Sequence, residues 1–180
     1  MTYFMLANGF EEAEALVPFD ILTRCEINCC LVSFEESNLV TGSHGIRVLA
    51  DMMLKDMDLS DAECIVFPGG GVGTENLDKN PYTDIILKEA TERNLLIGAI
   101  CAAPVVLAKE GLLQEKRATC YPDKAEELGD SYVDEDVVVD LPFVTGKSAG
   151  VAQQFALQLI EELRGKEAAD EVAAKVYFQR

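Results

Sequence analysis

Short apolar runs rich in β-branched residues alternate with longer amphipathic stretches along this chain. Such alternation is typical of an α/β fold with a mostly parallel sheet, because helical crossovers connect the parallel strands. The pattern predicts strands over residues 3–7, 28–34, 63–67, 95–100, 117–120, 137–140 and 143–146, with a small hairpin or edge strands within 39–50. It predicts a first helix that is capped by Asn8 and ends at about residue 25. Further helices are predicted over residues 81–94, 102–109, 150–163 and 166–176. The 180 residues contain no linker or repeat, so we expect one domain over residues 1–180.

The charge balance excludes several classes of partner. The chain has 15 Lys and Arg against 32 Asp and Glu, a formal net charge of −17. Nucleic-acid binding needs cationic side chains to neutralise phosphates, and binding to an anionic membrane surface needs them too, so we expect neither partner. The longest nearly apolar stretch, residues 95–108, is interrupted by Gly98 and Pro104. The N-terminus lacks the basic region of a signal peptide, and we therefore expect a cytoplasmic protein.

The cysteines and the single histidine limit the cofactor chemistry. Six cysteines occur, none in C-x-x-C spacing: Cys25, Cys29, Cys30, Cys64, Cys101 and Cys120. They are typical of reduced thiols rather than of a disulfide framework or a zinc site. His44 is the only histidine, so a histidine-based metal cluster is excluded, and we predict neither a metal nor a cofactor.

Three features follow predicted strands and should meet at one edge of the sheet, where open α/β folds place their sites. The first is Cys101, between the strand 95–100 and a predicted helix. This arrangement resembles a nucleophile elbow without the G-x-S-x-G pattern, and a helix N-terminus favours the thiolate. The alternative is a small buried apolar residue before a helix.

The second feature is the glycine-rich run 68–73, whose backbone N–H groups are suited to an oxyanion hole or an anion nest. The alternative is a tight turn between a strand and a helix. The third feature is the acidic run 11–14 at the start of the first helix. Carboxylates favour a helix N-terminus, which accounts for Glu11 and Glu12. Glu14 lies one turn further in, and a carboxyl group that faces the sheet there would stay protonated and exchange protons with a thiolate or a substrate.

These features coincide with a family pattern. The chain resembles the DJ-one/ThiJ/PfpI superfamily over essentially its whole length, and is most similar to the branch that contains the parkinsonism-associated deglycase and the bacterial ThiJ-like proteins. The runs that carry the resemblance are residues 6–14 (LANGFEEAE), 67–70 (FPGG), 99–104 (AICAAP), 145–150 (TGKSAG) with 155–157, and 165–167.

The resemblance implies a flavodoxin-like three-layer sandwich with a mostly parallel central sheet, and a homodimer. It implies that Cys101 is an oxidation-sensitive nucleophile, that Glu14 is its protonated partner, and that Gly69, Gly70 and the amide of Ala102 line an anion pocket. The activities it implies are cofactor-free glyoxalase or deglycase chemistry on reactive dicarbonyls, a non-enzymatic redox response in which Cys101 reaches the sulfinate, and holdase chaperoning. The small-molecule partner is then a reactive carbonyl or an oxidant.

The chain departs from the family pattern in its histidines. Ala102 follows Cys101 where the protease-like members have a histidine, so a Cys-His hydrolase is not expected. Tyr121 stands where the deglycase branch often has a histidine; it can donate a hydrogen bond but is a poor base near neutral pH. His44 lies in a segment that approaches the partner's site in dimeric members. Two interpretations of His44 remain open, an auxiliary group that acts in trans and a surface-loop histidine.

Overall fold

The central sheet of the computed structural model, which describes residues 1–179, has the strand order β5-β2-β1-β6-β7-β9-β8. All neighbouring strands are parallel except β8 and β9, which confirms the mostly parallel sheet. A separate antiparallel hairpin is formed by β3 and β4. The strands are β1 (Thr2–Leu6), β2 (Cys29–Ser33), β3 (Leu39–Thr41), β4 (Arg47–Leu49), β5 (Met52–Met53), β6 (Cys64–Phe67), β7 (Leu96–Ile100), β8 (Val137–Asp140) and β9 (Phe143–Gly146).

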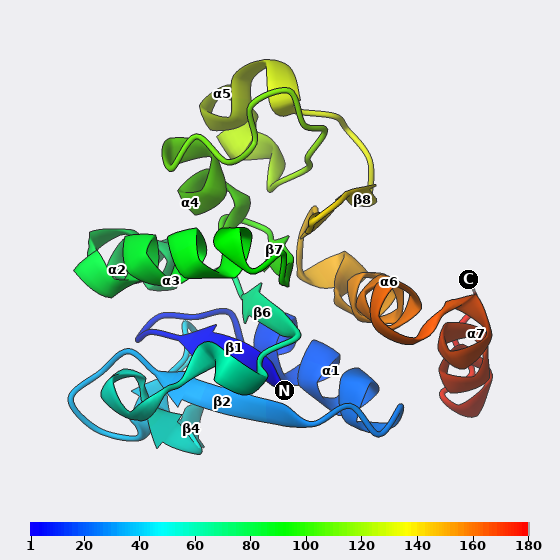
Figure 1. The fold of residues 1–180 in the computed structure, drawn as a ribbon, viewed down its shortest axis with the longest axis horizontal. Coiled ribbons are helices and arrows are strands. Elements are labelled where there is room, and N and C mark those ends of the chain that lie inside the picture. Colours follow the sequence, from blue (N-terminus) through cyan, green and yellow to red (C-terminus); the bar gives the residue numbers. More distant parts are fainter. Residues whose placement is uncertain (180) are drawn as a thin grey trace.

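Helices cover both faces of the sheet, as a parallel sheet requires. Figure 1 shows α1 (Glu12–Thr23), α6 (Ala152–Arg164) and α7 (Lys166–Lys175) on one side of the central strands. It shows α2 (Gly71–Lys79) and α3 (Pro81–Glu92) on the other side, with α4 (Pro104–Lys109) and α5 (Ala125–Leu128) beyond them. Within residues 1–179, no helix has the length and apolar character needed to cross a membrane.

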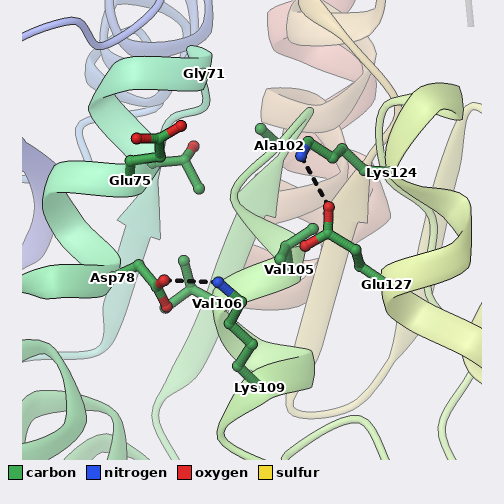
Figure 2. Close-up of a pocket in the computed structure, with 10 residues that line it drawn as sticks. Gly71, Glu75, Asp78, Ala102, Val105, Val106, Lys109, Lys124 and Glu127 are labelled. Atoms are coloured by element: carbon green, nitrogen blue, oxygen red, sulfur yellow. Dashed lines mark hydrogen bonds and ion pairs between the residues drawn. The ribbon is translucent and has the colours of Figure 1, made fainter.

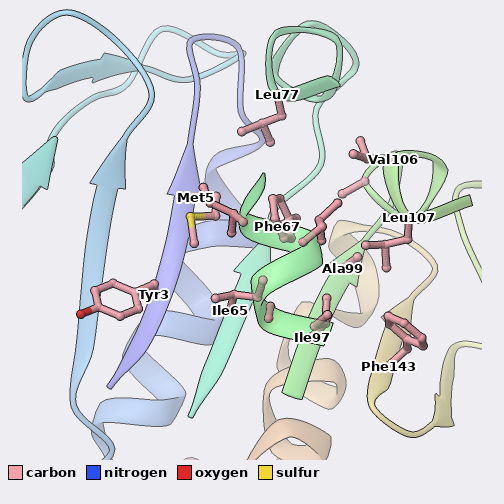
Figure 3. Packing of buried hydrophobic residues seen from close by; sticks show 14 of the residues in the cluster. Tyr3, Met5, Ile65, Phe67, Leu77, Ile97, Ala99, Val106, Leu107 and Phe143 are labelled. Atoms are coloured by element: carbon pink, nitrogen blue, oxygen red, sulfur yellow. The ribbon is translucent and has the colours of Figure 1, made fainter. Parts of the chain in front are cut away.

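The strands divide their side chains between two hydrophobic clusters, because successive residues of a strand point to opposite faces. In β1, Tyr3 and Met5 pack towards α2, α3 and α4, whereas Phe4 and Leu6 pack towards α1 and α6. Figure 3 shows the first cluster, in which β1, β6 and β7 face Leu77 of α2 together with residues of α4. The central strands are therefore buried on both faces, and this packing fixes the position of their carboxyl ends.

One predicted strand is absent, and one helix was not predicted. Residues 117–120 form no strand of the sheet; Ala118 makes only an isolated bridge to Tyr132, and the Thr119 N–H donates to the Thr145 side chain. Helix α2 was not predicted, because glycines at its start have low helix propensity. Its first turn is held by contacts from elsewhere in the chain: the Gly73 N–H donates to the Gly9 carbonyl.

Two helix starts also differ from the predictions. Glu11, not Asn8, caps α1, and its carboxylate accepts a hydrogen bond from the Glu14 N–H at 2.7 Å. The Asn8 side chain instead accepts from the Thr41 N–H at 2.8 Å and so binds the β3–β4 hairpin. Helix α4 begins at Pro104 rather than at residue 102, because residues 101–103 form a turn.

Candidate active site

The structure brings together Glu14 from α1, Gly69 after β6 and Cys101 after β7. The Gly69 N–H donates to Glu14 Oε2 at 2.9 Å. A β-carbon added at Gly69 would lie 2.5 Å from Glu14 Oε2 and 2.7 Å from the Cys101 β-carbon. Gly69 therefore lies against both functional side chains, and any larger residue there would displace one of them.

Cys101 occupies a strained backbone turn at the end of β7. Its φ angle is 64°, in the left-handed region that non-glycine residues rarely adopt. The Cys101 N–H donates to the Gly146 carbonyl of β9, and the Cys101 carbonyl accepts from the Tyr121 N–H, both at 2.8 Å. This anchored turn is the geometry of a nucleophile elbow, in which strain presents the reactive side chain at the edge of the sheet.

The glycine loop and the loop before α1 pack against each other. The Glu11 N–H donates to the Gly69 carbonyl at 2.9 Å. Gly70 has a φ angle of 93°, and a β-carbon there would collide with the Gly9 carbonyl oxygen and with the Glu11 nitrogen. Gly70 is thus required both by its backbone angle and by the close approach of the loop before α1. The loop is more than a generic turn, because its backbone also contacts Glu14 and Cys101.

Burial dominates the electrostatics of Glu14. Only 1% of this residue is exposed, and burial raises the pKa of its carboxyl group from 4.5 to about 7, against opposing hydrogen bonds from Cys101 and from the backbone of Gly69 and Ala149. The Glu11 charge raises this pKa as well. Glu14 Oε1 is buried without a hydrogen-bond partner of standard geometry among the described residues. A protonated Glu14 therefore has a donor to offer to the sulfur.

The Cys101 thiol and the Glu14 carboxyl titrate as a pair. Burial raises the pKa of Cys101, and a charged Glu14 beside it raises that pKa further, whereas the backbone N–H groups of Gly70 and Ala102 lower it. The expectation that a helix N-terminus lowers this pKa was wrong, because burial and the Glu14 charge outweigh the backbone N–H groups, and α4 begins only at Pro104. Residue Cys101 is partly exposed and its sulfur has two backbone donors, whereas Glu14 is fully buried. Taken singly, the two pKa shifts place the first proton release of the pair on Glu14, and a Cys101 thiolate held by a protonated Glu14 stays a prediction.

The two amides of the predicted anion pocket, those of Gly70 and Ala102, both act on the Cys101 sulfur. The Gly69 N–H, by contrast, is used by Glu14 and is not free to bind a substrate. The pocket therefore has two donors for a developing negative charge beside the nucleophile, a number that is adequate for oxyanion stabilisation.

The structure places Tyr121 beside the elbow through its backbone, as described above, while its side chain is exposed. His44 lies on the β3–β4 hairpin, and 71% of its side chain is exposed. Its Nδ1 bonds Glu12 Oε2 at 2.7 Å and Ser43 Oγ at 3.1 Å. Within residues 1–179 the partners of the His44 side chain lie on the hairpin and at the start of α1, so in its own chain His44 acts as a loop residue.

Glu12 makes most of the hydrogen bonds between the β3–β4 hairpin and the start of α1. Its Oε1 accepts from the His44 N–H at 2.8 Å and from the Ile46 N–H at 3.4 Å. Burial raises the pKa of Glu12, but the hydrogen bonds from His44, from the backbone and from Ser43 outweigh it and lower the pKa to about 2. A β-carbon at Gly42 would collide with this carboxylate. Glu12 is therefore a permanent anion that holds the hairpin on α1.

Glu11, Glu12 and His44 also form a group of possible metal ligands, since one ligand atom of each lies within 4.8 Å of the others. Both oxygens of Glu12 already accept hydrogen bonds, and one oxygen of Glu11 caps α1. The hydrogen bonds that attach the hairpin to α1 therefore account for the arrangement of these three side chains.

Sequence reasoning missed two contributors to the site. Ala149 lies at the start of the segment before α6, and its backbone hydrogen bond lowers the pKa of Glu14. Gly146 anchors the elbow through its carbonyl oxygen. Both residues belong to the run 145–150 that carries the family resemblance. Their contacts are made by backbone atoms across more than forty residues, and such contacts do not affect the pattern of side chains in the sequence.

Comparison with known proteins agrees with this architecture. A model of the DJ-1/PfpI family matches residues 2–162. Protein dj-1beta of Drosophila melanogaster is 36% identical over 172 residues, which cover 94% of this chain and 92% of that protein. The glutathione-independent glyoxalase DJR-1.2 of Caenorhabditis elegans is 36% identical over 160 residues, 87% of this chain and 84% of that protein.

The solved structure of oxidized DJ-1 from Toxoplasma gondii superposes with a TM-score of 0.96 at 32% identity, covering 99% of this chain and 98% of that one. The elbow cysteine, the buried glutamate and the glycine loop thus belong to a fold that this chain shares along its whole length with that protein. The chain is a member of the DJ-1/PfpI family.

Proposed function

We propose that this protein is a cofactor-free glyoxalase-type enzyme that converts small dicarbonyl compounds into hydroxy acids, with Cys101 as nucleophile and Glu14 as acid and base. The observation that carries the proposal is the Glu14 carboxyl beside Cys101, with a pKa raised to about 7. A group with such a pKa gives up and takes back a proton at neutral pH, as an isomerisation through an enediol requires. The name of the nematode relative, a glutathione-independent glyoxalase, supports the same chemistry.

The first step forms a bond between the Cys101 sulfur and the aldehyde carbon of methylglyoxal. The negative charge that develops on the carbonyl oxygen faces the N–H groups of Gly70 and Ala102 and is quenched by a proton, giving a hemithioacetal. Glu14 then removes the proton from the former aldehyde carbon and returns one to the neighbouring carbon. The resulting thioester is hydrolysed by water, which releases lactate and regenerates the thiol. The net reaction converts methylglyoxal and water into lactate and a proton.

Tyr121 stands where a histidine would supply a second base, and its side chain is exposed. Glu14 then carries both proton transfers of the isomerisation. Loss of a single general acid–base group typically costs two to four orders of magnitude in rate, so we expect turnover well below that of a relative with a histidine at this position.

The test is the formation of lactate from methylglyoxal by the wild type, Cys101→Ser and Glu14→Gln, with Cys25→Ser as the control for loss of a thiol outside the site. Turnover in the wild type and in Cys25→Ser, and its loss in the other two variants, would support the proposal. Turnover that survives in Cys101→Ser would overturn it.

A second candidate function, a non-enzymatic redox response, is favoured by the same protonated Glu14. A sulfinate on Cys101 carries two oxygens with a negative charge, and the Glu14 O–H and the two backbone N–H groups are donors for it. Two peroxide molecules would each transfer one oxygen atom to the sulfur and leave as water. Intact mass after mild peroxide treatment tests this function: selective gain of two oxygens at Cys101 without lactate formation supports it, and oxidation spread over other cysteines contradicts it.

A further inference from the structure

The Cys101 turn is held between β9 and residues 118–121, a segment that forms no strand of the central sheet. On the side of β9, the Cys101 N–H donates to the Gly146 carbonyl oxygen at 2.8 Å. On the other side, the Tyr121 N–H donates to the Cys101 carbonyl oxygen at 2.8 Å. These bonds fix the two peptide groups that flank the Cys101 α-carbon. They therefore restrain a φ angle of 64°, which a residue with a β-carbon rarely adopts.

Thr145 connects the two sides of this turn. It precedes Gly146 in β9, and its Oγ1 accepts a hydrogen bond from the Thr119 N–H at 2.9 Å. Thr119 and Thr145 are both buried, and a buried N–H group that loses its acceptor costs free energy. The Thr145 oxygen thus attaches the chain two residues before Tyr121 to the same strand that anchors Cys101.

Further hydrogen bonds of the segment go to a loop. The Ala118 N–H donates to the Ser131 carbonyl oxygen, and the Thr119 hydroxyl donates to the Glu135 carbonyl oxygen, both at 2.8 Å. The two acceptors lie between α5 and β8. These bonds attach the segment to its neighbouring loop, whereas the bond to Thr145 attaches it to the sheet.

The chain that follows the segment has room to move. It continues into residues 122–127, and Figure 2 shows a cavity between this part of the chain, α2 and α4. The cavity has a volume of about 80 Å³, and its lining includes Ala102, Val105, Val106, Lys124 and Glu127. Tight packing opposes the displacement of a chain segment, and an open space opposes it less. Residues 118–121 can therefore shift away from the elbow when the bond to Thr145 is lost.

We propose that Thr145 is a positioning residue for the nucleophile, because its hydroxyl oxygen holds residues 118–121 against Cys101 and so maintains the turn that presents the sulfur at the edge of the sheet. The inference rests on the role of Cys101 in the proposed function, but it concerns the reactivity of the thiol and not the turnover of a dicarbonyl. Without the Thr145 oxygen, the Cys101 backbone relaxes towards a common φ angle. The sulfur then withdraws from the edge of the sheet and from the N–H groups of Gly70 and Ala102.

The test is the rate of alkylation of Cys101 by iodoacetamide as a function of pH, followed by peptide mass. Thr145→Val keeps the shape of the side chain but removes the acceptor. We expect its rate at pH 7 to fall by about fivefold or more and its apparent pKa to rise, because the sulfur is less accessible and loses backbone donors. Thr145→Ser keeps the acceptor and should stay within about twofold of the wild type. Thr145→Ala, in which water can reach the Thr119 N–H, should show the same change as the valine variant if that variant does not fold.

Thr83→Val is the matched control for the loss of a buried hydroxyl group. Thr83 is also fully buried, and its hydroxyl donates to the Leu77 carbonyl oxygen at 2.6 Å, in α3 and away from the elbow. Urea denaturation should show a comparable loss of stability in Thr83→Val and Thr145→Val. The pH profile of Cys101 alkylation should change in Thr145→Val alone, and hydrogen exchange of the Tyr121 amide should accelerate there alone.

An unchanged or faster alkylation of Cys101 in Thr145→Val overturns the proposal. So does an equal change of the pH profile in Thr83→Val, since the effect would then follow from lost stability and not from the position of Cys101. Formation of lactate from methylglyoxal is measured beside alkylation in each variant. A wild type that forms no lactate, with the alkylation results as expected, counts against the proposed enzyme and leaves the role of Thr145 supported.

Discussion

At the scale of single residues, the reactivity of Cys101 depends on where the last proton of the Glu14–Cys101 pair resides. We predict that a protonated Glu14 donates to a Cys101 thiolate, so that the apparent pKa for alkylation of Cys101 by iodoacetamide is lower with this donor than without it. Glu14→Gln keeps a donor and should retain the reactive thiolate. Glu14→Leu removes the donor and should raise the apparent pKa. The rate of alkylation as a function of pH in the three proteins measures this.

The other cysteines provide the internal control for that prediction. Burial raises the pKa of Cys25, Cys29, Cys30, Cys64 and Cys120 as it does that of Cys101, but among residues 1–179 only Cys101 has a side-chain hydrogen bond to a carboxyl group. Peptide mapping after substoichiometric alkylation should therefore find the label on Cys101. An unchanged apparent pKa in Glu14→Leu would show that Glu14 is only a helix-terminus carboxylate.

The raised pKa of Glu14 also makes stability depend on pH. The folded Glu14–Cys101 pair releases its first proton near pH 7, whereas the Glu14 carboxyl group of the unfolded chain releases its proton near 4.5. The folded state therefore binds more protons between these values, and the free energy of unfolding falls as pH rises from about 4.5 to 7, by on the order of 3 kcal/mol. Urea denaturation at pH 5, 6, 7 and 8 measures this slope. Glu14→Gln should flatten it, and the exposed control Glu92→Gln should leave it as in the wild type.

Sequence reasoning at this scale found the side chains that follow strands. Cys101 and Glu14 could be predicted because the carboxyl ends of β7 and β1 share one edge of the sheet, and because the run 11–14 resembles a known pattern. The sequence predicted Asn8 as the cap of α1, whereas the structure has Glu11 there, because both side chains are acceptors near the start of a helix. The two residues differ in their partners only once the β3–β4 hairpin is in place, because the Thr41 N–H of the hairpin then donates to the Asn8 side chain.

At the scale of elements, Glu12 controls the attachment of the β3–β4 hairpin. Glu12→Ala should remove the acceptor for two backbone N–H groups and for His44, and we expect a loss of stability on the order of 2 kcal/mol. Hydrogen exchange of the His44 and Ile46 amides should accelerate. His44→Ala should have a smaller effect, because the backbone N–H groups keep their acceptor.

The exposed loop variant Glu36→Gln is the control for loss of a negative charge near this hairpin. If exchange at Ile46 is unchanged in Glu12→Ala, other contacts must hold the hairpin, among them the bond from the Gly9 N–H to the Thr41 carbonyl.

Elements with a strong periodic pattern were predictable, and elements set by distant contacts were not. The sequences of strands β1, β6 and β7 are continuous apolar runs, because both faces of these strands are buried. Helix α2 starts with Gly71-Val72-Gly73, a sequence with no helical preference, and depends on the loop before α1 for its first turn. The segment 117–120 has the composition of a strand, but Thr145 and the loop around Ser131 take up its backbone N–H groups.

At the scale of the whole molecule, we expect a homodimer formed through α1 and the β3–β4 hairpin. The hairpin exposes three large apolar side chains: 46% of Leu39, 53% of Ile46 and 74% of Leu49 are accessible in the single chain. Leu49→Glu should shift the mass measured by light scattering towards the monomer value of 19.7 kDa. Ile85→Glu, on an exposed apolar residue of α3, should leave the dimer intact.

The net charge of −17 opposes association of two copies, so added salt should strengthen the dimer by screening this repulsion. A mass that stays at 19.7 kDa for the wild type at micromolar concentration, with and without salt, would contradict the homodimer.

The strand order has a consequence for the chain as it leaves the ribosome. The half-sheet β5-β2-β1-β6 and helix α1, which packs on it, are complete once residue 67 has been made, yet α6, the helix that packs on α1, begins only at Ala152. Translation of the intervening residues takes several seconds at typical rates of about 5–20 residues per second. Throughout that interval the nascent chain presents α1 without the helix that packs against it. A nascent chain stalled before α6 should therefore recruit holdase chaperones far more strongly than one stalled after it.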